Sequence, residues 1–291
     1  MVEEIAAAYG FQRVELGERL EGGYANDLLR VDADGRALVA RVKHPPVDEA
    51  DLAWEHALVG RLAERLPEVL PPLATTDGRT WITVREDVVA LMAFVDAAPA
   101  DPAHRGAAAE ALGRLHAAGG SLDPGPRPRL RPLAELDWPD PAIPEELAAW
   151  GDVLVRERPW AIEHVARVAR ERAPVRGLIH GDIFPGNVLV AGGALVATID
   201  WEEAQVDWLC WDVAIALGTF CARGDELDAG ACQVFLARYR EVGGTMPEAE
   251  DDLLERLVRV KRILEVLRAP GDRHPRWEHQ LANLRSLSRL G

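Results

Sequence analysis

A carboxylate and an amide stand five residues apart in a short segment rich in turn residues. The segment reads His180-Gly181-Asp182-Ile183-Phe184-Pro185-Gly186-Asn187 and lies between two apolar runs. A tight loop of this kind allows Asp182 and Asn187 to face the same cavity. Transfer of a phosphoryl group to an alcohol needs such a pair, because the carboxylate can accept the hydroxyl proton while the neutral amide oxygen helps to hold Mg²⁺.

A second carboxylate follows at the end of the next predicted hairpin. Two apolar runs, Val188–Val190 and Ala194–Ile199, flank Ala191-Gly192-Gly193 and lead to Asp200. Asp200 would lie beside Asn187 and complete a metal site. The spacing H-x-D-x-x-x-x-N is that of a kinase catalytic loop. His-Gly-Asp alone can be a simple turn with a capping aspartate, and Asn after Pro-Gly an ordinary turn residue. The combination favours the kinase interpretation.

The elements that must position these residues change character along the chain. The first 95 residues are predicted to form an antiparallel sheet with one helix at 48–65, and the rest a mostly helical part. The predicted strands are Gln12–Leu20, Leu28–Val31, Ala37–Lys43, Trp81–Arg85 and Val88–Phe94. The predicted helices of the second part are Arg105–Ala118, Glu145–Arg172, Asp212–Cys221, Glu226–Val242, Glu248–Leu267 and Trp277–Leu290, with a proline-rich loop at Pro124–Pro141.

Composition restricts the class of protein. The 291 residues carry a formal net charge of -15 at pH 7, which disfavours binding to nucleic acid or to anionic membranes. Neither a secretory signal nor a membrane-spanning segment is expected, so we expect a cytoplasmic protein. The three cysteines form no C-x-x-C pair, which fits neither a disulfide framework nor a zinc site.

These motifs resemble the aminoglycoside phosphotransferase and homoserine kinase superfamily, which includes choline-kinase-like enzymes. The resemblance is strongest over Leu178–Cys221, and Leu112-Gly113-Arg114-Leu115-His116 is similar to a helix of that family. It implies an α+β, protein-kinase-like bilobal fold with an N-lobe at 1–95 and a C-lobe at 96–291. It also implies that Asp212 braces the catalytic loop through backbone hydrogen bonds, that His180 supports this loop, and that His116 is structural.

The resemblance extends more weakly to nucleotide binding in the N-lobe. There it implies a loop that covers the phosphates, a phosphate-binding cation with its glutamate partner, and a hinge that holds the base. Arg41 is the favoured cation, but Lys43 lies on the same strand face and stays open. The expected nucleotide-binding residues are Gly22, Gly23, Asn26, Arg41, Glu55, Met92 and Phe94. Glu202, where protein kinases have glycine, argues against a protein-kinase activation segment.

The expected reaction is Mg²⁺-dependent transfer from ATP or GTP to a small-molecule hydroxyl, in a monomer or homodimer. Asp182 would be the base, and Asn187 and Asp200 the metal ligands. An acidic and aromatic group after Asp200 favours an amine-bearing acceptor. This group comprises Glu202, Glu203, Asp207 and Trp208. An antibiotic is the first expectation, and homoserine or a choline-like metabolite the alternative. A non-catalytic pseudokinase and a metal-dependent hydrolase are the other hypotheses.

Overall fold

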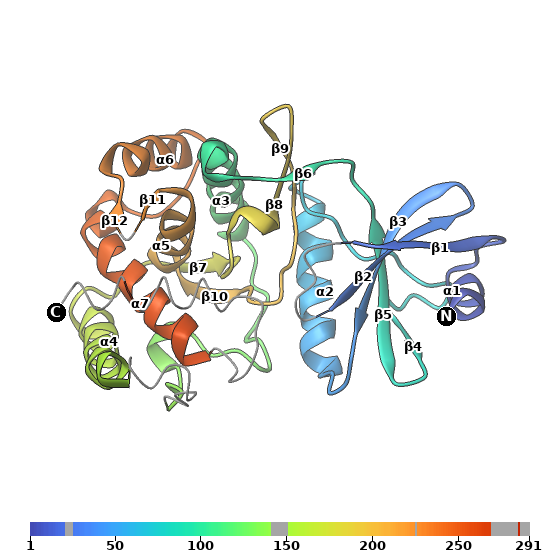
Figure 1. The fold of residues 1–291 in the computed structure, drawn as a ribbon, viewed down its shortest axis with the longest axis horizontal. Coiled ribbons are helices and arrows are strands. Elements are labelled where there is room, and N and C mark those ends of the chain that lie inside the picture. The colour runs from blue at the N-terminus through green and yellow to red at the C-terminus, as the bar shows by residue number, and fades with distance from the viewer. Residues whose placement is uncertain (21–25, 141–150, 225, 269–284, 286–291) are drawn as a thin grey trace. The chain divides into compact units, whose positions relative to one another are not determined.

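The computed structural model describes residues 1–20, 26–140, 151–224, 226–268 and 285. The chain forms two compact units, which are described separately (Figure 1). The first unit contains Met1–Pro99 and Val188–Glu202, and the second contains Ala100–Asn187 and Glu203–Gly291. The predicted C-terminal helix, Trp277–Leu290, lies outside the described residues apart from position 285.

A five-stranded antiparallel sheet forms the centre of the first unit. Its strand order is β1-β2-β3-β5-β4. The strands are β1 (Val14–Arg19), β2 (Asp27–Ala33), β3 (Arg36–Lys43), β4 (Ile82–Val84) and β5 (Asp87–Ala93). The β2–β3 turn has positive φ at Asp34 and Gly35, 52° and 76°, which matches the right-handed twist of a hairpin. This turn sets the register in which β2 and β3 pair.

Two helices belong to the same unit. Helix α2 (Glu49–Ala63) begins at Asp48, whose carboxylate accepts from the backbone N–H groups of Ala50 and Asp51. Helix α1 (Val2–Tyr9) was not anticipated from the sequence. Its buried residues Ile5 and Tyr9 pack in one hydrophobic cluster with β1, β2, β3, β4 and β5. Burial of this apolar face explains why such a short helix is stable.

A three-stranded sheet joins the hairpin after Asn187 to the first unit. Strand β6 (Ala98–Pro99) pairs with β8 (Val188–Ala191), which pairs with β9 (Ala194–Thr198). The backbone N–H of Thr198 also donates to the carbonyl of Glu68 at 2.8 Å. These backbone hydrogen bonds explain why the unit contains Val188–Glu202, whereas the sequence suggested a single division near residue 95.

Helices dominate the second unit (Figure 1). They are α3 (Arg105–Gly119), α4 (Gly151–Glu171), α5 (Leu209–Phe220), α6 (Ala229–Glu241) and α7 (Leu254–Arg268). Short strand pairs join them: β7 (Arg176–Ile179) with β10 (Gln205–Trp208), and β11 (Ala222–Arg223) with β12 (Glu226–Leu227). Helix α5 is buried on nearly all sides, so it forms the centre of this unit. None of the helices described is both long and apolar enough to cross a membrane.

Some helix boundaries differ from those expected; α5, for example, begins at Leu209 rather than at Asp212. The helix predicted from Glu226 begins after Asp228, because Glu226 and Leu227 pair as β12 and Asp228 caps α6 by accepting from the N–H of Ala231. The helix predicted from Glu248 starts with a 3₁₀ segment, Glu248–Leu253, before α7. The differences at α6 and α7 concern the backbone conformation in the residues before the helix, which the spacing of apolar residues does not predict.

Helices α3 and α6 pack closely at Gly113, so the structure predicts that a larger residue there destabilises the fold. A Cβ added at Gly113 would lie 2.6 Å from the carbonyl oxygen of Tyr239, whereas one at Gly60 in α2 would meet nothing within 4 Å. We expect Gly113→Ala to lower the free energy of unfolding by about 1–3 kcal/mol. Gly60→Ala should raise it by up to about 1 kcal/mol through helix propensity. Urea denaturation measures both, and equal shifts of the same sign would contradict the packing.

Candidate active site

The loop that carries Asp182 follows strand β7 in the second unit. Gly181 has φ of 82°, and a Cβ there would lie 2.3 Å from the carbonyl oxygen of Glu203. Glycine is therefore required for both conformation and space. The 3₁₀ turn Pro185–Asn187 then returns the chain, so the Asn187 Nδ2 donates to the backbone oxygen of Asp182 at 2.9 Å. The five-residue spacing thus brings this amide and carboxylate together, 3.4 Å apart.

A buried carboxylate on α5 holds the same loop. Asp212, fully buried, accepts hydrogen bonds from the backbone N–H groups of His180 at 2.7 Å and Gly181 at 2.9 Å. Its Oδ2 also lies 3.2 Å from the Nε2 of His116. Burial opposes ionisation of Asp212, but His116 and the amides outweigh this effect and lower the pKa of the carboxyl group. Asp212 therefore fixes the backbone immediately before Asp182.

Two histidines complete this support. The Tyr239 hydroxyl accepts from the N–H of Met246 at 2.9 Å and lies 2.7 Å from the Nδ1 of His116. A proton on the Nε2 of His116 satisfies both this contact and the contact with Asp212. The Nδ1 of His180, also fully buried, accepts from the backbone N–H of Asp182 at 3.3 Å. Both histidines thus act on the backbone and the packing around the loop.

The side chains expected to hold a metal provide oxygen donors suited to Mg²⁺. The Nδ2 of Asn187 donates a hydrogen bond to Asp182, so the Oδ1 of Asn187 is the side-chain atom that can coordinate a cation. Asp200, in the first unit, follows β9, is exposed and has a positive φ of 64°. Aspartate adopts this left-handed conformation more often than most other non-glycine residues do. The residues described contain no group of three His, Cys, Asp or Glu side chains able to hold a metal.

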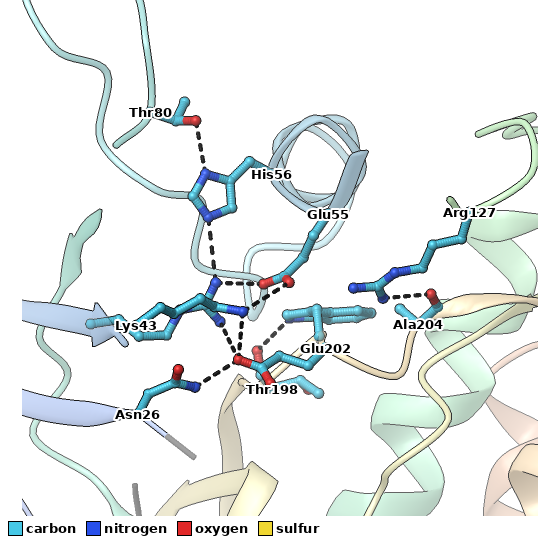
Figure 2. Close-up of polar contacts among 11 residues, drawn as sticks. Asn26, Lys43, Glu55, His56, Thr80, Arg127, Thr198, Glu202 and Ala204 are labelled. Atoms are coloured by element: carbon cyan, nitrogen blue, oxygen red, sulfur yellow. Dashed lines mark hydrogen bonds and ion pairs between the residues drawn. The ribbon is translucent and has the colours of Figure 1, made fainter. Parts of the chain in front are cut away.

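A cluster of opposite charges lies in the first unit, where β3 meets α2 (Figure 2). The Arg41 Nη2 donates to the Glu55 Oε1 at 2.6 Å, and the Lys43 Nζ lies 2.8 Å from the Glu202 Oε1. Lys43 also lies 3.9 Å from Glu55, and Arg41 3.7 Å from Glu202. Asn26 donates its Nδ2 to Glu202 at 2.6 Å. We name these five residues the β3 charge cluster; in it, Arg41 is the closer partner of Glu55.

Burial and charge have opposing effects within the β3 charge cluster. Burial opposes the charge of Arg41, but Glu55 and Glu202 outweigh it and raise the pKa of the guanidinium. Desolvation likewise acts against ionisation of Glu202, but Lys43 and Arg41 lower its pKa. His56 lies against the cluster: burial, with Arg41 adding to it, lowers the pKa of His56 to about 4. Its neutral ring accepts at Nε2 from Arg41 at 3.4 Å and donates from Nδ1 to Thr80 at 2.8 Å (Figure 2).

The other residues expected at the nucleotide are placed as follows. Gly22 and Gly23 lie outside the described residues. Met92 is in β5 and Phe94 follows it, with the backbone N–H of Phe94 donating to the Ala37 carbonyl at 3.1 Å. The Arg30 guanidinium lies 3.4 Å from the centre of the Phe94 ring. Roles of these residues in nucleotide binding stay predictions.

The four residues expected to bind the acceptor are distributed over the two units. Glu202 belongs to the β3 charge cluster, whereas Glu203 belongs to the second unit. Asp207 and Trp208 are buried, and Asp207 accepts from the N–H groups of Leu133 at 2.6 Å and Trp208 at 2.7 Å. Burial raises the pKa of Asp207 to about 6, although these amides oppose the change. We therefore assign Asp207 and Trp208 to the interior of the second unit.

Sequence reasoning missed Lys261, which α7 places beside Asp182. Its Nζ lies 3.7 Å from the Asp182 Oδ1. The residue is far from the catalytic loop in sequence and occurs in an ordinary amphipathic helix with several arginines, so no local motif marks it. A signal was present only in the helical periodicity, which places Lys261 next to buried positions such as Val260 and Leu264.

The antiparallel sheet, the helical unit and a loop that pairs an aspartate with an asparagine are features of a protein-kinase-like fold. The comparisons with known proteins agree. A family model described as the phosphotransferase enzyme family matches residues 17–249, and the chain belongs to this family.

Curated relatives agree with this assignment, and solved structures share the fold. It is 32% identical over 230 residues to a homoserine kinase of Gluconacetobacter diazotrophicus, covering 76% of this chain and 70% of the relative. It is 29% identical over 248 residues to a homoserine kinase of Rhodospirillum rubrum, covering 80% and 74%. A microcompartment-associated aminopropanol kinase has a similar fold, with a TM-score of 0.74 at 16% identity and coverage of 98% and 93%. A spectinomycin phosphotransferase in complex with ADP and spectinomycin gives 0.66 at 15% identity, covering 99% and 92%.

Asp207 and Asp212 are both buried in the second unit, so substituting each in turn tests whether Asp212 stabilises the loop that carries Asp182. Asp212→Asn replaces one accepting oxygen by an N–H₂ group that faces donors, so we expect the free energy of unfolding at pH 7 to fall by about 3–5 kcal/mol. Asp207→Asn should cost less, because the raised pKa of Asp207 shows that its charge is poorly stabilised. Urea denaturation of both variants measures this difference. An equal or larger loss in Asp207→Asn would contradict the role of Asp212.

The lowered pKa of His56 predicts a pH dependence of stability. In the unfolded chain the imidazole binds a proton below pH 6.5, whereas in the folded chain it does so only near pH 4. Stability of the folded state must therefore fall as the pH drops through this window. Relative to His56→Gln, the wild type should lose about 3 kcal/mol between pH 7 and pH 4. Chemical denaturation across this range tests it, and a constant difference between the two proteins would refute it.

Proposed function

We propose that the chain transfers the γ-phosphoryl group of ATP or GTP to the hydroxyl of a small, amine-bearing metabolite. The observation that carries this proposal is the loop in which Asp182 and Asn187 contact each other while Asp212 holds the preceding backbone. A loop fixed from both sides suits a reaction in which catalysis consists mainly of positioning and charge stabilisation. Membership of the phosphotransferase enzyme family supports the same reaction class.

Each candidate residue has a defined role in this proposal. Asp182 orients the acceptor hydroxyl and takes its proton as the oxygen attacks the γ-phosphorus, and the bond from that phosphorus to the diphosphate breaks. The products are a phosphate ester, the nucleoside diphosphate and a proton. Asn187 and Asp200 would hold Mg²⁺, which would neutralise charge on the phosphate oxygens. Arg41, paired with Glu55, contacts the phosphates.

The β3 charge cluster suggests how the phosphates would be accommodated. Arg41 and Lys43 are both ion-paired with Glu202, at 3.7 and 2.8 Å. A polyphosphate that contacted these cations would compete with the Glu202 carboxylate, because both are anionic oxygen ligands of the same donors. In this proposal Glu202 is therefore linked to the nucleotide rather than to the acceptor. Gly22, Gly23, Asn26, Met92 and Phe94 keep their proposed roles at the nucleotide.

Relatives guide the choice of acceptor. The curated relatives at about 30% identity are homoserine kinases, whereas the antibiotic kinases are similar to this chain in fold at 15–18% identity. A preference for a metabolite acceptor follows, and homoserine is the first to test. An antibiotic acceptor, the first expectation from the sequence, remains the second candidate because the spectinomycin phosphotransferase shares the fold.

A panel of acceptors tests the proposal directly. Release of ADP or GDP would be followed with homoserine, 3-aminopropan-1-ol, choline, spectinomycin and a kanamycin-type aminoglycoside, with and without Mg²⁺. We expect Mg²⁺-dependent release above the acceptor-free rate with homoserine, and a mass gain of one phosphate on the acceptor. Absence of acceptor-dependent release across the panel would argue against this function.

Removing the proposed base supplies the matching prediction. Asp182→Asn should lower kcat by about 10²–10⁴-fold, because the amide cannot accept the hydroxyl proton. Nucleotide affinity, measured by titration calorimetry, should change little. Asp140→Asn is the matched control, since the side chain of Asp140 is 95% exposed. Near-normal turnover in Asp182→Asn would remove Asp182 from its proposed role.

A further inference from the structure

Lys261 is a mostly buried cation beside the proposed catalytic base. Its side chain is 19% exposed, and its Nζ lies 3.7 Å from the Asp182 Oδ1 and 3.4 Å from the Glu265 Oε1, one turn further along α7. All three residues belong to the second unit. The ammonium group of Lys261 is therefore partly neutralised by Asp182, the carboxylate that orients the acceptor in the proposed function.

Surrounding charges are mixed rather than uniformly acidic. Arg268, at the end of α7, has its Nη1 3.7 Å from the Glu203 Oε2. Desolvation raises the pKa of Glu203, and Asp182 adds to this, while Arg268 and Lys261 oppose it. Desolvation also opposes the charge of Lys261, but Glu265, Asp182 and Glu203 outweigh it and raise the pKa of the ammonium group. Lys261 is therefore a permanent cation near neutral pH.

The distances from the Lys261 Nζ to the neighbouring carboxylates indicate that this ammonium group can also bind a ligand. Its separations from Asp182 and Glu265, 3.7 and 3.4 Å, exceed the usual N–H···O hydrogen-bond length of about 2.7–3.2 Å. These ion pairs balance charge without directing the three N–H donors of the ammonium group. An anionic group that entered beside Asp182 could accept a short, charge-assisted hydrogen bond from Lys261.

We propose, on the basis of the function proposed above, that Lys261 binds a carboxylate of the acceptor and so selects hydroxy amino acids over plain amino alcohols. The acceptor carboxylate would accept from Lys261 while its hydroxyl faces Asp182. The ammonium group of the acceptor would contact Glu203 or Glu265.

Two acceptors that differ only in the carboxylate isolate this interaction. 3-Aminopropan-1-ol has the hydroxyl, carbon chain and amine of homoserine but lacks the carboxylate. We expect Lys261→Met to raise KM for homoserine about 10- to 100-fold, the usual loss for a hydrogen bond to a charged group, and to leave KM for 3-aminopropan-1-ol nearly unchanged. Lys261→Arg should restore part of the preference. Arg256→Met removes an exposed cation of the same helix and should change neither KM.

A binding measurement separates Lys261 from the chemistry of Asp182. 2-Aminobutyrate is homoserine without its hydroxyl, so it cannot be phosphorylated. It should inhibit the wild type and Lys261→Arg competitively against homoserine, and it should inhibit Lys261→Met at least tenfold less strongly. Thermal unfolding of each variant confirms that the comparison is between folded proteins.

The outcomes distinguish this inference from the proposed function. Equal losses for both acceptors in Lys261→Met would show that Lys261 only positions Asp182 and would overturn carboxylate binding. Turnover of choline or an antibiotic, with no turnover of homoserine, would also overturn it while leaving the phosphotransferase function intact. If no hydroxyl acceptor supports release of ADP or GDP, the proposed function fails and this inference fails with it.

Discussion

The buried carboxylate of Asp212 holds the conformation of the loop that carries Asp182. Gly181 turns with a positive φ, and Asp212 accepts hydrogen bonds from the backbone N–H groups of His180 and Gly181 at 2.7 and 2.9 Å. Buried N–H groups without acceptors would cost the folded state about 1–3 kcal/mol each. Because Asp212 is itself held by His116 and this histidine by Tyr239, the loop depends on how α3, α5 and α6 pack. The conformation of this short loop therefore depends on the packing of three helices that lie elsewhere in the sequence.

Both units contain balanced groups of charge inside a strongly acidic protein. Arg41 and Lys43 face Glu55 and Glu202 in the first unit, and Lys261 lies near two carboxylates in the second. Charges in such groups are desolvated, so their partners determine whether each stays ionised. The surplus of negative charge, -15 in total, says little about these groups, because each depends on its immediate partners.

Sequence patterns predicted features that depend on neighbouring residues. The sheet strands, helix α2, and the spacing that joins Asp182 to Asn187 all follow from local periodicity and turn chemistry. Features set by distant partners were less accessible. Helix α1 is stabilised by the sheet it covers, and Asp207, a polar residue in an acidic segment, is buried because two backbone amides require an acceptor there. Lys261 reaches Asp182 only through the packing of α7.

The path of the backbone between the units has a consequence for how this molecule can be divided. The chain passes from one compact unit to the other after Pro99, Asn187 and Glu202. Strand β6 finds its partner in β8, nearly ninety residues later, so the amino-terminal portion alone lacks the partner of its last strand. Neither unit corresponds to an uninterrupted stretch of polypeptide. No single cut of the polypeptide would therefore release both units intact.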